Sequence, residues 1–339
     1  MQRVPEFMKE MEKGNFAREI LVEALGCRGE AQEALFAMAR RRRDECFPQR
    51  KVEVRSVIEV SNVCQQACNY CNMGLLSGQE RYTMDREELV HLAEHLHEKG
   101  RRVLLLQSGE CIQQPFVDMV AGAVADLTQR HPDLTLILCM GNMSEDQFRQ
   151  LHDAGARRYI LKFEASDPEL YHALKPRDTL PQRLACLESL LRLGFQVGTG
   201  DIVGVPGQTT EHLLGDLDLL GRYALSMQSC TVFIPGENSV YRDQPMGDVD
   251  TTLNMMAIAR IRYPGRLMPT TSSLEKGREG GQFLGLMAGA NTVTIHDGTP
   301  ENLKHLFPIY STKRFTPKNA HLTDIVAKAG LRLSQEALT

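Results

Sequence analysis

The sequence predicts a parallel (β/α)8 barrel of the TIM type, preceded by a helical extension, and three observations favour this α/β fold class. Short apolar runs alternate with amphipathic helical segments about eight times over about 280 residues. The runs are continuously apolar, as in strands that are buried on both faces of a parallel sheet. The length of 339 residues fits this barrel better than an open doubly wound sheet. Periodicity alone does not show that the sheet closes.

The predicted elements follow one another along the chain in a regular order. The first 50 residues read as helices, so we divide the chain into a helical extension (1–50) and a barrel with a C-terminal helix (51–339). Strands are expected at 52–60, 103–107, 134–140, 158–164, 196–204, 229–235, 266–272 and 291–296. Helices are expected at 85–100, 116–130, 144–155, 179–193, 210–223, 251–263 and 281–290.

The bulk composition predicts a cytoplasmic protein that binds neither a membrane nor a nucleic acid. The chain is 42% hydrophobic with a net charge of −4, and no apolar run approaches the roughly 20 residues that span a bilayer. The first residues mix charges and lack the apolar core of a secretory signal. Mild acidity argues against a nucleic-acid partner, and the basic run Arg40–Arg43 reads as the solvated end of a helix.

The cysteines point to a metal site rather than to disulfides. The chain has 9 cysteines, an odd number in a large chain that is expected to be cytoplasmic. Most are dispersed, but Cys64, Cys68 and Cys71 lie together in "SNVCQQACNYCNMG", just after the first predicted strand. Ligands bind at the carboxyl ends of the strands in both candidate sheets, so this segment lies where a site is expected.

Three thiols in this spacing fit an iron–sulfur cluster best. A structural zinc site needs four ligands, usually in two pairs, and no second pair is present. A thioredoxin-type pair of Cys68 and Cys71 would leave Cys64 unexplained. Three thiolates on a [4Fe–4S] cluster leave one iron open to an external ligand, such as a substrate or cosubstrate.

The C-x3-C-x2-C pattern, with Tyr70 before the last cysteine, resembles the signature of radical S-adenosylmethionine (SAM) enzymes. In that family the amine and carboxylate of SAM chelate the open iron, and an electron from the cluster yields a 5′-deoxyadenosyl radical. The resemblance therefore implies a [4Fe–4S] cluster, SAM, a low-potential electron donor and a small-molecule substrate inside the barrel. A low-potential electron must be delivered at contact distance, which agrees with ligation of the cosubstrate to the cluster.

Several further segments resemble one branch of this family, the [FeFe]-hydrogenase maturases of the HydE type and their relatives biotin synthase and methylornithine synthase. The segments are "RSVIEVSNVC", "RYTMDREEL", "LLQSGE", "DIVGVPGQT", "FIPGENS", "MPTTS" and "GLMAGANTV". The resemblance implies a step in metallocofactor assembly, with a partner protein in that assembly. Sulfur insertion, a carbon-skeleton rearrangement and a non-catalytic scaffold that binds SAM or a cluster stay as alternatives.

Residues that match SAM-binding positions of this branch lie at the ends of the predicted strands or in the helix after the fourth. Ser108, Gly109 and Glu110 match a motif that binds the SAM amino group, although a plain turn would also explain them. Glu164 and Arg183 match positions that hold the ribose or methionine moiety, and a guanidinium suits the SAM carboxylate. A solvent-facing helical arginine is the alternative for Arg183. The adenine is expected beside Gly200, Ile202 and Gly204.

An auxiliary cluster and a substrate site are weaker predictions. Cys111 and Cys139 follow the second and third strands, and Cys230 in the sixth could point inward, so these thiols could hold a second iron–sulfur cluster or simply be buried. The chain has Gln107 and Gly198 where biotin synthase has cysteines. Substrate contacts are expected from two groups of residues at the barrel mouth, which could equally be turn and cap residues: Thr270, Thr271 and Ser272, and His296 and Asp297.

Overall fold

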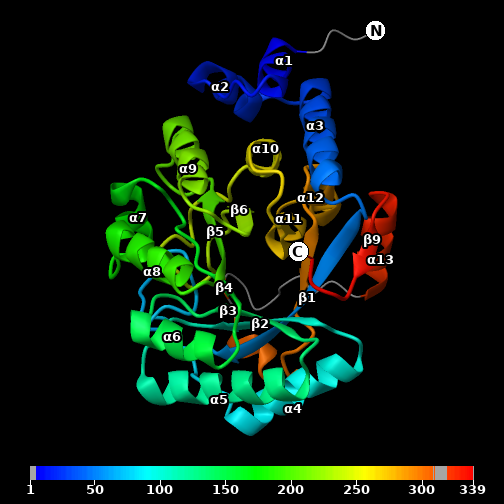
Figure 1. Cartoon of the computed structure of the whole chain (residues 1–339). Coiled ribbons are helices and arrows are strands. Elements are labelled where there is room, and N and C mark those ends of the chain that lie inside the picture. Colours follow the sequence, from blue (N-terminus) through cyan, green and yellow to red (C-terminus); the bar gives the residue numbers. More distant parts are fainter. Residues whose placement is uncertain (1–4, 308, 310–318, 339) are drawn as a thin grey trace.

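A computed structural model describes residues 5–307, 309 and 319–338 of the chain. Three helices come first, α1 (Glu6–Glu12), α2 (Arg18–Gly26) and α3 (Glu30–Cys46). They lie on the outside of the barrel (Figure 1), where α2 and α3 pack against α10 (Val249–Arg262). The amide of Asn254 in α10 fixes them by donating to the backbone carbonyls of Leu25 and Cys27, at 2.9 Å each. The division at residue 50 stays a prediction.

One end of α3 differs from the expectation. Arg43 is only 2% exposed, and its guanidinium donates to the backbone carbonyl of Leu286 at 2.9 Å. The run Arg40–Arg43 is therefore not wholly a solvated helix end, because one of its arginines is a buried link between α3 and the barrel.

Eight parallel strands form a nearly closed barrel, which confirms the predicted fold class. The strands are β1 (Lys51–Ser61), β2 (Val103–Ser108), β3 (Thr135–Cys139), β4 (Arg158–Ile160), β5 (Gln196–Val203), β6 (Met227–Val232), β7 (Pro269–Thr270) and β8 (Thr292–Ile295). Their order is β6-β5-β4-β3-β2-β1-β8-β7. The circle closes through one parallel bridge between Met227 of β6 and Leu267, just before β7.

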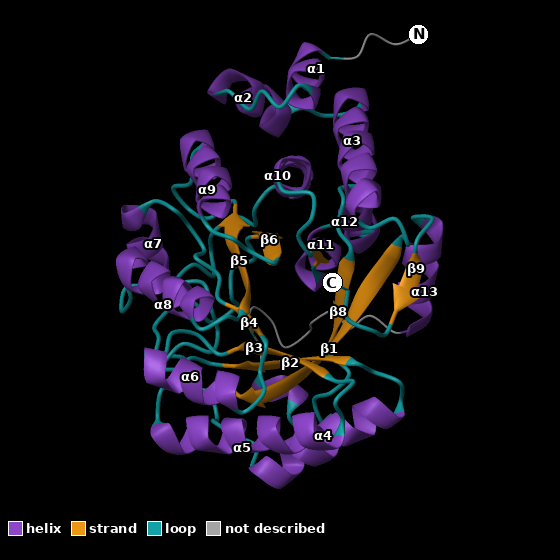
Figure 2. Cartoon of the chain, viewed as in Figure 1, coloured by secondary structure: helices purple, strands orange, loops and turns teal. Residues whose placement is uncertain are grey.

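Helices cover the outside of this barrel (Figure 2). They are α4 (Arg86–Glu98), α5 (Gln114–Arg130), α6 (Glu145–Asp153), α7 (Pro168–Leu174), α8 (Leu180–Arg192), α9 (Thr210–Arg222), α10, α11 (Ser272–Gly277), α12 (Gly281–Met287), a 3-10 turn (Lys304–Leu306) and α13 (Asn319–Lys328). Capping boxes at Asp85, Ser144 and Thr209 explain the starts of α4, α6 and α9. No helix in the described part of the chain is both long and apolar enough to cross a bilayer.

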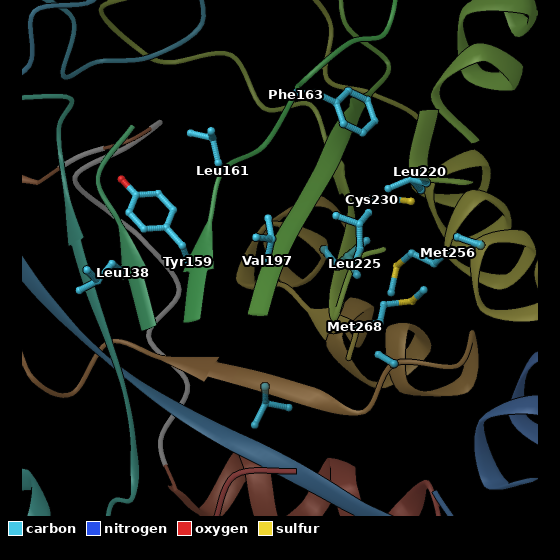
Figure 3. Close-up of a cluster of buried hydrophobic side chains, with 14 of the residues drawn as sticks. Leu138, Tyr159, Leu161, Phe163, Val197, Leu220, Leu225, Cys230, Met256 and Met268 are labelled. Atoms are coloured by element: carbon cyan, nitrogen blue, oxygen red, sulfur yellow. The ribbon is translucent and has the colours of Figure 1, made fainter. Parts of the chain in front are cut away.

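The two faces of the strands carry different side chains. The inward-facing cluster consists of Val57, Val103, Leu105 and Ile137. Alternate residues face the helices instead, and Figure 3 shows Val197 and Cys230 in this outer layer with Leu220 and Met256. Since side chains alternate along a strand, the register of each strand decides which residues can reach a ligand inside the barrel.

Buried charges and the C-terminal segment close the base of the barrel. Glu53 is fully buried and accepts hydrogen bonds from Arg55 (2.7 Å) and Arg158 (3.0 Å). The backbone N–H of Leu338 donates to the same carboxylate at 2.7 Å, and Arg158 donates to the Leu338 carbonyl at 2.6 Å. A ninth strand, β9 (Arg332–Ser334), pairs with the start of β1. This arrangement leaves the opposite end, the mouth, for a ligand.

Candidate active site

The cysteine loop leaves the carboxyl end of β1 at the mouth, and Arg81 fixes its conformation. The Arg81 guanidinium donates to the backbone carbonyls of Asn62 (2.7 Å), Met73 (2.8 Å) and Gly74 (2.7 Å), which lie on both sides of the three cysteines. A single side chain thus ties the two ends of the loop together. Sequence reasoning did not single out Arg81.

The three thiols of this loop are partly buried and form no disulfide. Burial raises the pKa of Cys64, Cys68 and Cys71, and the negative charge of neighbouring thiolates raises the pKa of Cys68 and Cys71 further. The backbone N–H groups of Glu110 and Met73 point at the sulfurs of Cys64 and Cys71, each at 3.4 Å. Donors of this kind stabilise thiolates that bind a metal cluster.

The three sulfurs lie too far apart to be ligands of one zinc ion. The sulfurs of Cys64, Cys68 and Cys71 do not all lie within 4.8 Å of one another. Within the described ranges, only one set of three possible metal-ligand atoms does, and it lies elsewhere in the fold. Sulfur ligands of one tetrahedral zinc ion would lie about 3.8 Å apart, given Zn–S bonds of about 2.3 Å. Thiolate ligation also requires these thiols to lose the protons that burial favours, so cluster assembly must release protons.

The turn after β2 packs directly against this loop. A Cβ atom on Gly109 would lie 2.4 Å from the carbonyl oxygen of Val63 and 2.8 Å from the Cβ of Cys64. Any larger residue would therefore push the turn and the cysteine loop apart. Ser108 is buried and donates to the Gly109 carbonyl at 2.7 Å, which stabilises the turn itself.

Glu110 ends this turn in a small polar pocket. Its carboxylate accepts hydrogen bonds from the side-chain amide of Gln66 (2.5 Å) and from the backbone N–H of Asn142 (2.9 Å). The side-chain oxygens of Gln66 and Asn142 are buried and accept no hydrogen bond from any described residue. Buried acceptors normally have donors, so a ligand with an amino group fits this place. The arrangement agrees with the SAM amine that the Ser-Gly-Glu motif was expected to bind.

Four of the predicted SAM residues also meet at one point of the mouth. Glu164 has a left-handed φ of 64° and exchanges backbone hydrogen bonds with Gly200 (3.0 Å) and Ile202 (2.8 Å) of β5. The hydroxyl of Tyr70 lies 3.4 Å from the Glu164 carboxylate. Lys162 forms an ion pair with the same carboxylate at 2.9 Å. Left-handed backbone is uncommon for a residue other than glycine, and it is typical of functional sites.

Arg183 is buried, which excludes a solvent-facing role. It is 4% exposed, and its Nε donates to the Tyr171 hydroxyl at 3.0 Å. Its terminal nitrogen lies 3.6 Å from a Glu110 oxygen and 3.4 Å from an Asp178 oxygen. Lys175 adds a second buried cation 3.3 Å from Asp178. The guanidinium is thus joined to the Glu110 pocket through a network of two cations and two carboxylates.

Two of the expected substrate residues do not face the mouth, so these predictions are wrong. Thr270 is fully buried, and its hydroxyl donates to the backbone carbonyl of Gln282 in α12 at 2.7 Å. Asp297 forms an ion pair with Arg101 at 2.8 Å, and Arg101 precedes β2 at the base of the barrel. The short length of β7 explains the error for Thr270. The strand has only two residues, so its sequence shows no alternation of inward-facing and outward-facing side chains.

The other two residues of the threonine–serine group begin a helix. The Thr271 hydroxyl lies 2.7 Å from the Ser273 hydroxyl, and Ser272 is the first residue of α11. Thr271 and Ser272 therefore lie at a helix start, as the alternative interpretation of cap residues expected. A contact of either residue with substrate stays a prediction.

The structure does not bring the three auxiliary cysteines together. Cys139 ends β3 beside the inward-facing cluster, whereas Cys111 and Cys230 lie in the core between the barrel and the helices. The expectation that Cys230 points inward is therefore wrong. Burial raises the pKa of Cys139 to about 11 and that of Cys230 well above its ordinary value.

The predicted site residues do not include two inward-facing charged side chains. Glu59 of β1 is fully buried, and its carboxylate lies 3.0 Å from Nδ1 of His296. Lys162 lies two residues after the end of β4 and two residues before Glu164. The signal was present in "VEVRSVIEV", since Glu53, Arg55 and Glu59 recur at even spacing on one face of the strand. Charges on an inward face indicate a polar barrel interior.

Comparison with known proteins shows the family to which the chain belongs. The profile of the radical SAM superfamily matches residues 58–220. The [FeFe] hydrogenase maturase subunit HydE of Thermotoga maritima is 33% identical to this chain over 312 residues, 91% of this chain and 88% of that protein. The chain belongs to the radical SAM superfamily. This radical SAM enzyme is also 26% identical over 270 residues to the 3-methylornithine synthase of Methanosarcina barkeri, 78% of this chain and 75% of that one.

Solved structures agree with the barrel. The crystal structure of methylornithine synthase (PylB) matches this radical SAM enzyme with a TM-score of 0.83 and 21% identity, over 97% of each chain. The maturase HydG from Carboxydothermus hydrogenoformans matches with a TM-score of 0.81 and 18% identity, over 97% of this chain and 78% of that one. At such identities the similarity shows the shared fold alone.

Membership defines the cofactors of this enzyme as a [4Fe–4S] cluster and SAM. When bound, the cluster supplies the electron that cleaves SAM to a 5′-deoxyadenosyl radical, which acts on a small substrate. The protein residues hold the cluster, orient SAM and shield the radical from water. A nearly closed barrel with a sealed base keeps water away from one end of the interior, as radical chemistry requires.

Proposed function

We propose that Cys64, Cys68 and Cys71 hold the cluster and that the surrounding mouth holds SAM. In this proposal Glu110, with the free acceptors of Gln66 and Asn142, binds the amino group. The buried guanidinium of Arg183 holds the carboxylate, and Tyr70, Glu164, Gly200, Ile202 and Gly204 line the nucleoside side. The observation that carries the proposal is the convergence of separate segments on one mouth: the cysteine loop against Gly109, and Glu164 against β5.

We infer further that the reaction is a step in metallocofactor assembly of the HydE type. The similarity to HydE extends over most of both chains and includes the segments that form the mouth. Sulfur insertion is less well supported, because Cys139 packs against one cluster of the core whereas Cys111 and Cys230 belong to another. The inward-facing Lys162 and the Glu59–His296 pair suit a small polar substrate.

The electron donor or assembly partner is proposed to dock beside the cysteine loop. The exposed large apolar residues of the described chain all lie on loops that follow strands at the mouth: Leu75, Leu76, Ile112, Val240 and Met246. Leu76, on the cysteine loop itself, is 84% exposed. Apolar rims of this kind mark protein interaction sites, and a donor must approach the cluster closely.

The effect of a variant on docking of the electron donor can be separated from its effect on SAM cleavage by comparing a protein reductant with a chemical reductant. Leu76→Ser should lower the rate of SAM cleavage driven by a flavodoxin or ferredoxin, and leave the rate with dithionite unchanged. Equal rates with the protein donor in the wild type and in Leu76→Ser would contradict this docking site.

The proposed reaction is tested in two steps. Reconstituted protein with SAM and dithionite should form 5′-deoxyadenosine, and Cys68→Ala should form none and lose the iron–sulfur absorption, since two thiolates do not hold the cluster. The gene should then restore hydrogenase activity to a strain that lacks HydE. Restoration supports the maturase reaction. SAM cleavage without restoration would refute it and favour a rearrangement of the methylornithine synthase type.

A further inference from the structure

Two histidines and an aspartate meet at the base of the helical layer, far along the strands from the cysteine loop. His97 lies in the last turn of α4, His131 directly follows α5, and Asp133 lies in the turn that leads into β3. The two helices lie side by side (Figure 1). One ligand atom from each of the three residues lies within 4.8 Å of the other two, an arrangement that no other three histidines, cysteines or acidic residues of the described chain share.

The geometry of this cluster resembles that of a metal site before its ion is bound. Nε2 of His97 lies 3.0 Å from Oδ1 of Asp133, and the imidazole rings of His97 and His131 have centroids 4.3 Å apart. The side chains of the histidines are 18% and 24% exposed and that of Asp133 is 52% exposed. An ion can therefore reach the site from solvent. The two imidazole rings are mostly buried, so neighbouring side chains restrict their movement.

Neighbouring residues orient the ligands and balance the charge. Arg102 forms an ion pair with Oδ2 of Asp133 at 2.6 Å and holds this carboxylate beside His97, whose Nε2 lies 3.0 Å from Oδ1 and 3.1 Å from Oδ2. Glu94, one turn before His97 in α4, lies 3.5 Å from Nε2 of His131 and pairs with Arg130 at 3.0 Å. Contacts of this kind commonly orient the ligands of a metal. The ends of α4 and α5 add partial negative charge, which favours a cation.

The donor set selects the class of ion. Two imidazole nitrogens and one carboxylate oxygen are ligands that Zn²⁺, Ni²⁺ and Co²⁺ accept, whereas Ca²⁺ and Mg²⁺ prefer oxygen ligands alone. The carboxylates of Asp133 and Glu94 are balanced by the guanidiniums of Arg102 and Arg130, so binding of the ion would depend on coordination rather than on excess negative charge.

We propose that His97, His131 and Asp133 bind a divalent ion of the Zn²⁺ class, which ties the C-terminal ends of α4 and α5 together. Water or Glu94 completes the coordination. The site lies at the opposite end of the strands from the cysteine loop, so the ion stabilises the helical layer and takes no part in SAM cleavage.

The test uses the reconstituted protein, with its cluster in place, and Zn²⁺ alone as the probe. Equilibrium dialysis should find one zinc per chain beyond the cluster iron, and an iron content that stays near four per chain. Zinc at about 100 times its dissociation constant should raise the unfolding midpoint by about 4 °C. His131→Ala should lose both effects, and Asp133→Asn should weaken zinc binding at least about 10-fold.

His95→Ala is the matched control. His95 lies on the same helix, is 52% exposed and does not belong to the cluster, so its variant should bind zinc like the wild type. The proposal is overturned if the wild type binds no zinc, or if His131→Ala and Asp133→Asn bind it as tightly as His95→Ala does.

Discussion

Replacing Arg183 by Gln should destabilise the fold and weaken SAM binding together, because the guanidinium is a buried counter-charge. Its contacts at 3.6 Å to Glu110 and 3.4 Å to Asp178 are each worth about 5 kcal/mol of Coulomb energy at an effective dielectric constant of about 20, before desolvation. Removing one partner of a buried ion pair costs about 3–5 kcal/mol net. Lys175 remains beside Asp178, so we expect the lower end, about 3 kcal/mol.

Unfolding curves of the reconstituted protein measure this loss. An unfolding entropy of about 2.1 cal/mol/K per residue converts about 3 kcal/mol into a fall of about 4 °C in Tm. Arg192→Gln is the matched control on the same helix: that side chain is 58% exposed and pairs with Glu145 at 2.7 Å. A surface pair of this kind contributes less than about 1 kcal/mol, so the Tm of the control should hardly change.

SAM titration adds an independent result for the same variants. Loss of the charge-assisted hydrogen bonds from Arg183 should weaken SAM binding by about 1.5–3 kcal/mol, or about 10- to 150-fold in Kd. Equal Tm values for Arg183→Gln and Arg192→Gln would refute the buried counter-charge. A destabilised Arg183→Gln that binds SAM with wild-type affinity would refute the assignment of this residue to the cosubstrate.

Three further outcomes are expected. The wild type should carry about four irons, and the double variant Cys111→Ala, Cys139→Ala should carry the same number and still cleave SAM; about eight irons falling to four would restore the auxiliary cluster. Gly109→Ala should fold but bind little iron, because its Cβ meets the cysteine loop, whereas Gly26→Ala meets no atom within 4 Å and should keep its iron. Burial raises the pKa of Asp201 from 3.8 to about 6, so the native state binds more protons than the unfolded state between these pH values and stability falls as pH rises through this range; Asp201→Asn should flatten this decline in Tm.

The sequence revealed local features and missed features that depend on packing. The barrel and the cysteine loop were predictable, since alternation and short spacing are local properties of the chain. The seventh strand was expected at 266–272, but it has two residues and gives way to α11, because Pro269 has no N–H to donate and Thr271 stands at the helix start. The helix α7 (Pro168–Leu174) and the strand β9 were not expected at all.

Arg183 shows why the rest could not be predicted. Its place in an amphipathic helix fits a solvated arginine as well as a buried one, and only the tertiary contacts with Glu110 and Asp178 decide between them. The same holds for Asp297, whose position after β8 indicated the mouth until its ion pair with Arg101 turned it toward the base. Arg183 and Glu110 are 73 positions apart and Asp297 and Arg101 are 196 positions apart, so no local pattern records these contacts.

The pairing of β9 with β1 affects how the chain matures during synthesis. β9 begins at Arg332 and pairs with Lys51, so at about 5–20 residues per second the ribosome completes the partner of the first strand about 15–55 s after making that strand. Until β8 (Thr292–Ile295) and then β9 are made, one edge of β1 has no partner strand. The side chains of Glu53, Arg55 and Glu59 in β1 are charged and hydrated before the barrel forms. Charged strand edges resist pairing with other nascent chains. We therefore expect the charges that form the buried ion pairs of the barrel base to lower aggregation of the chain before the fold is complete.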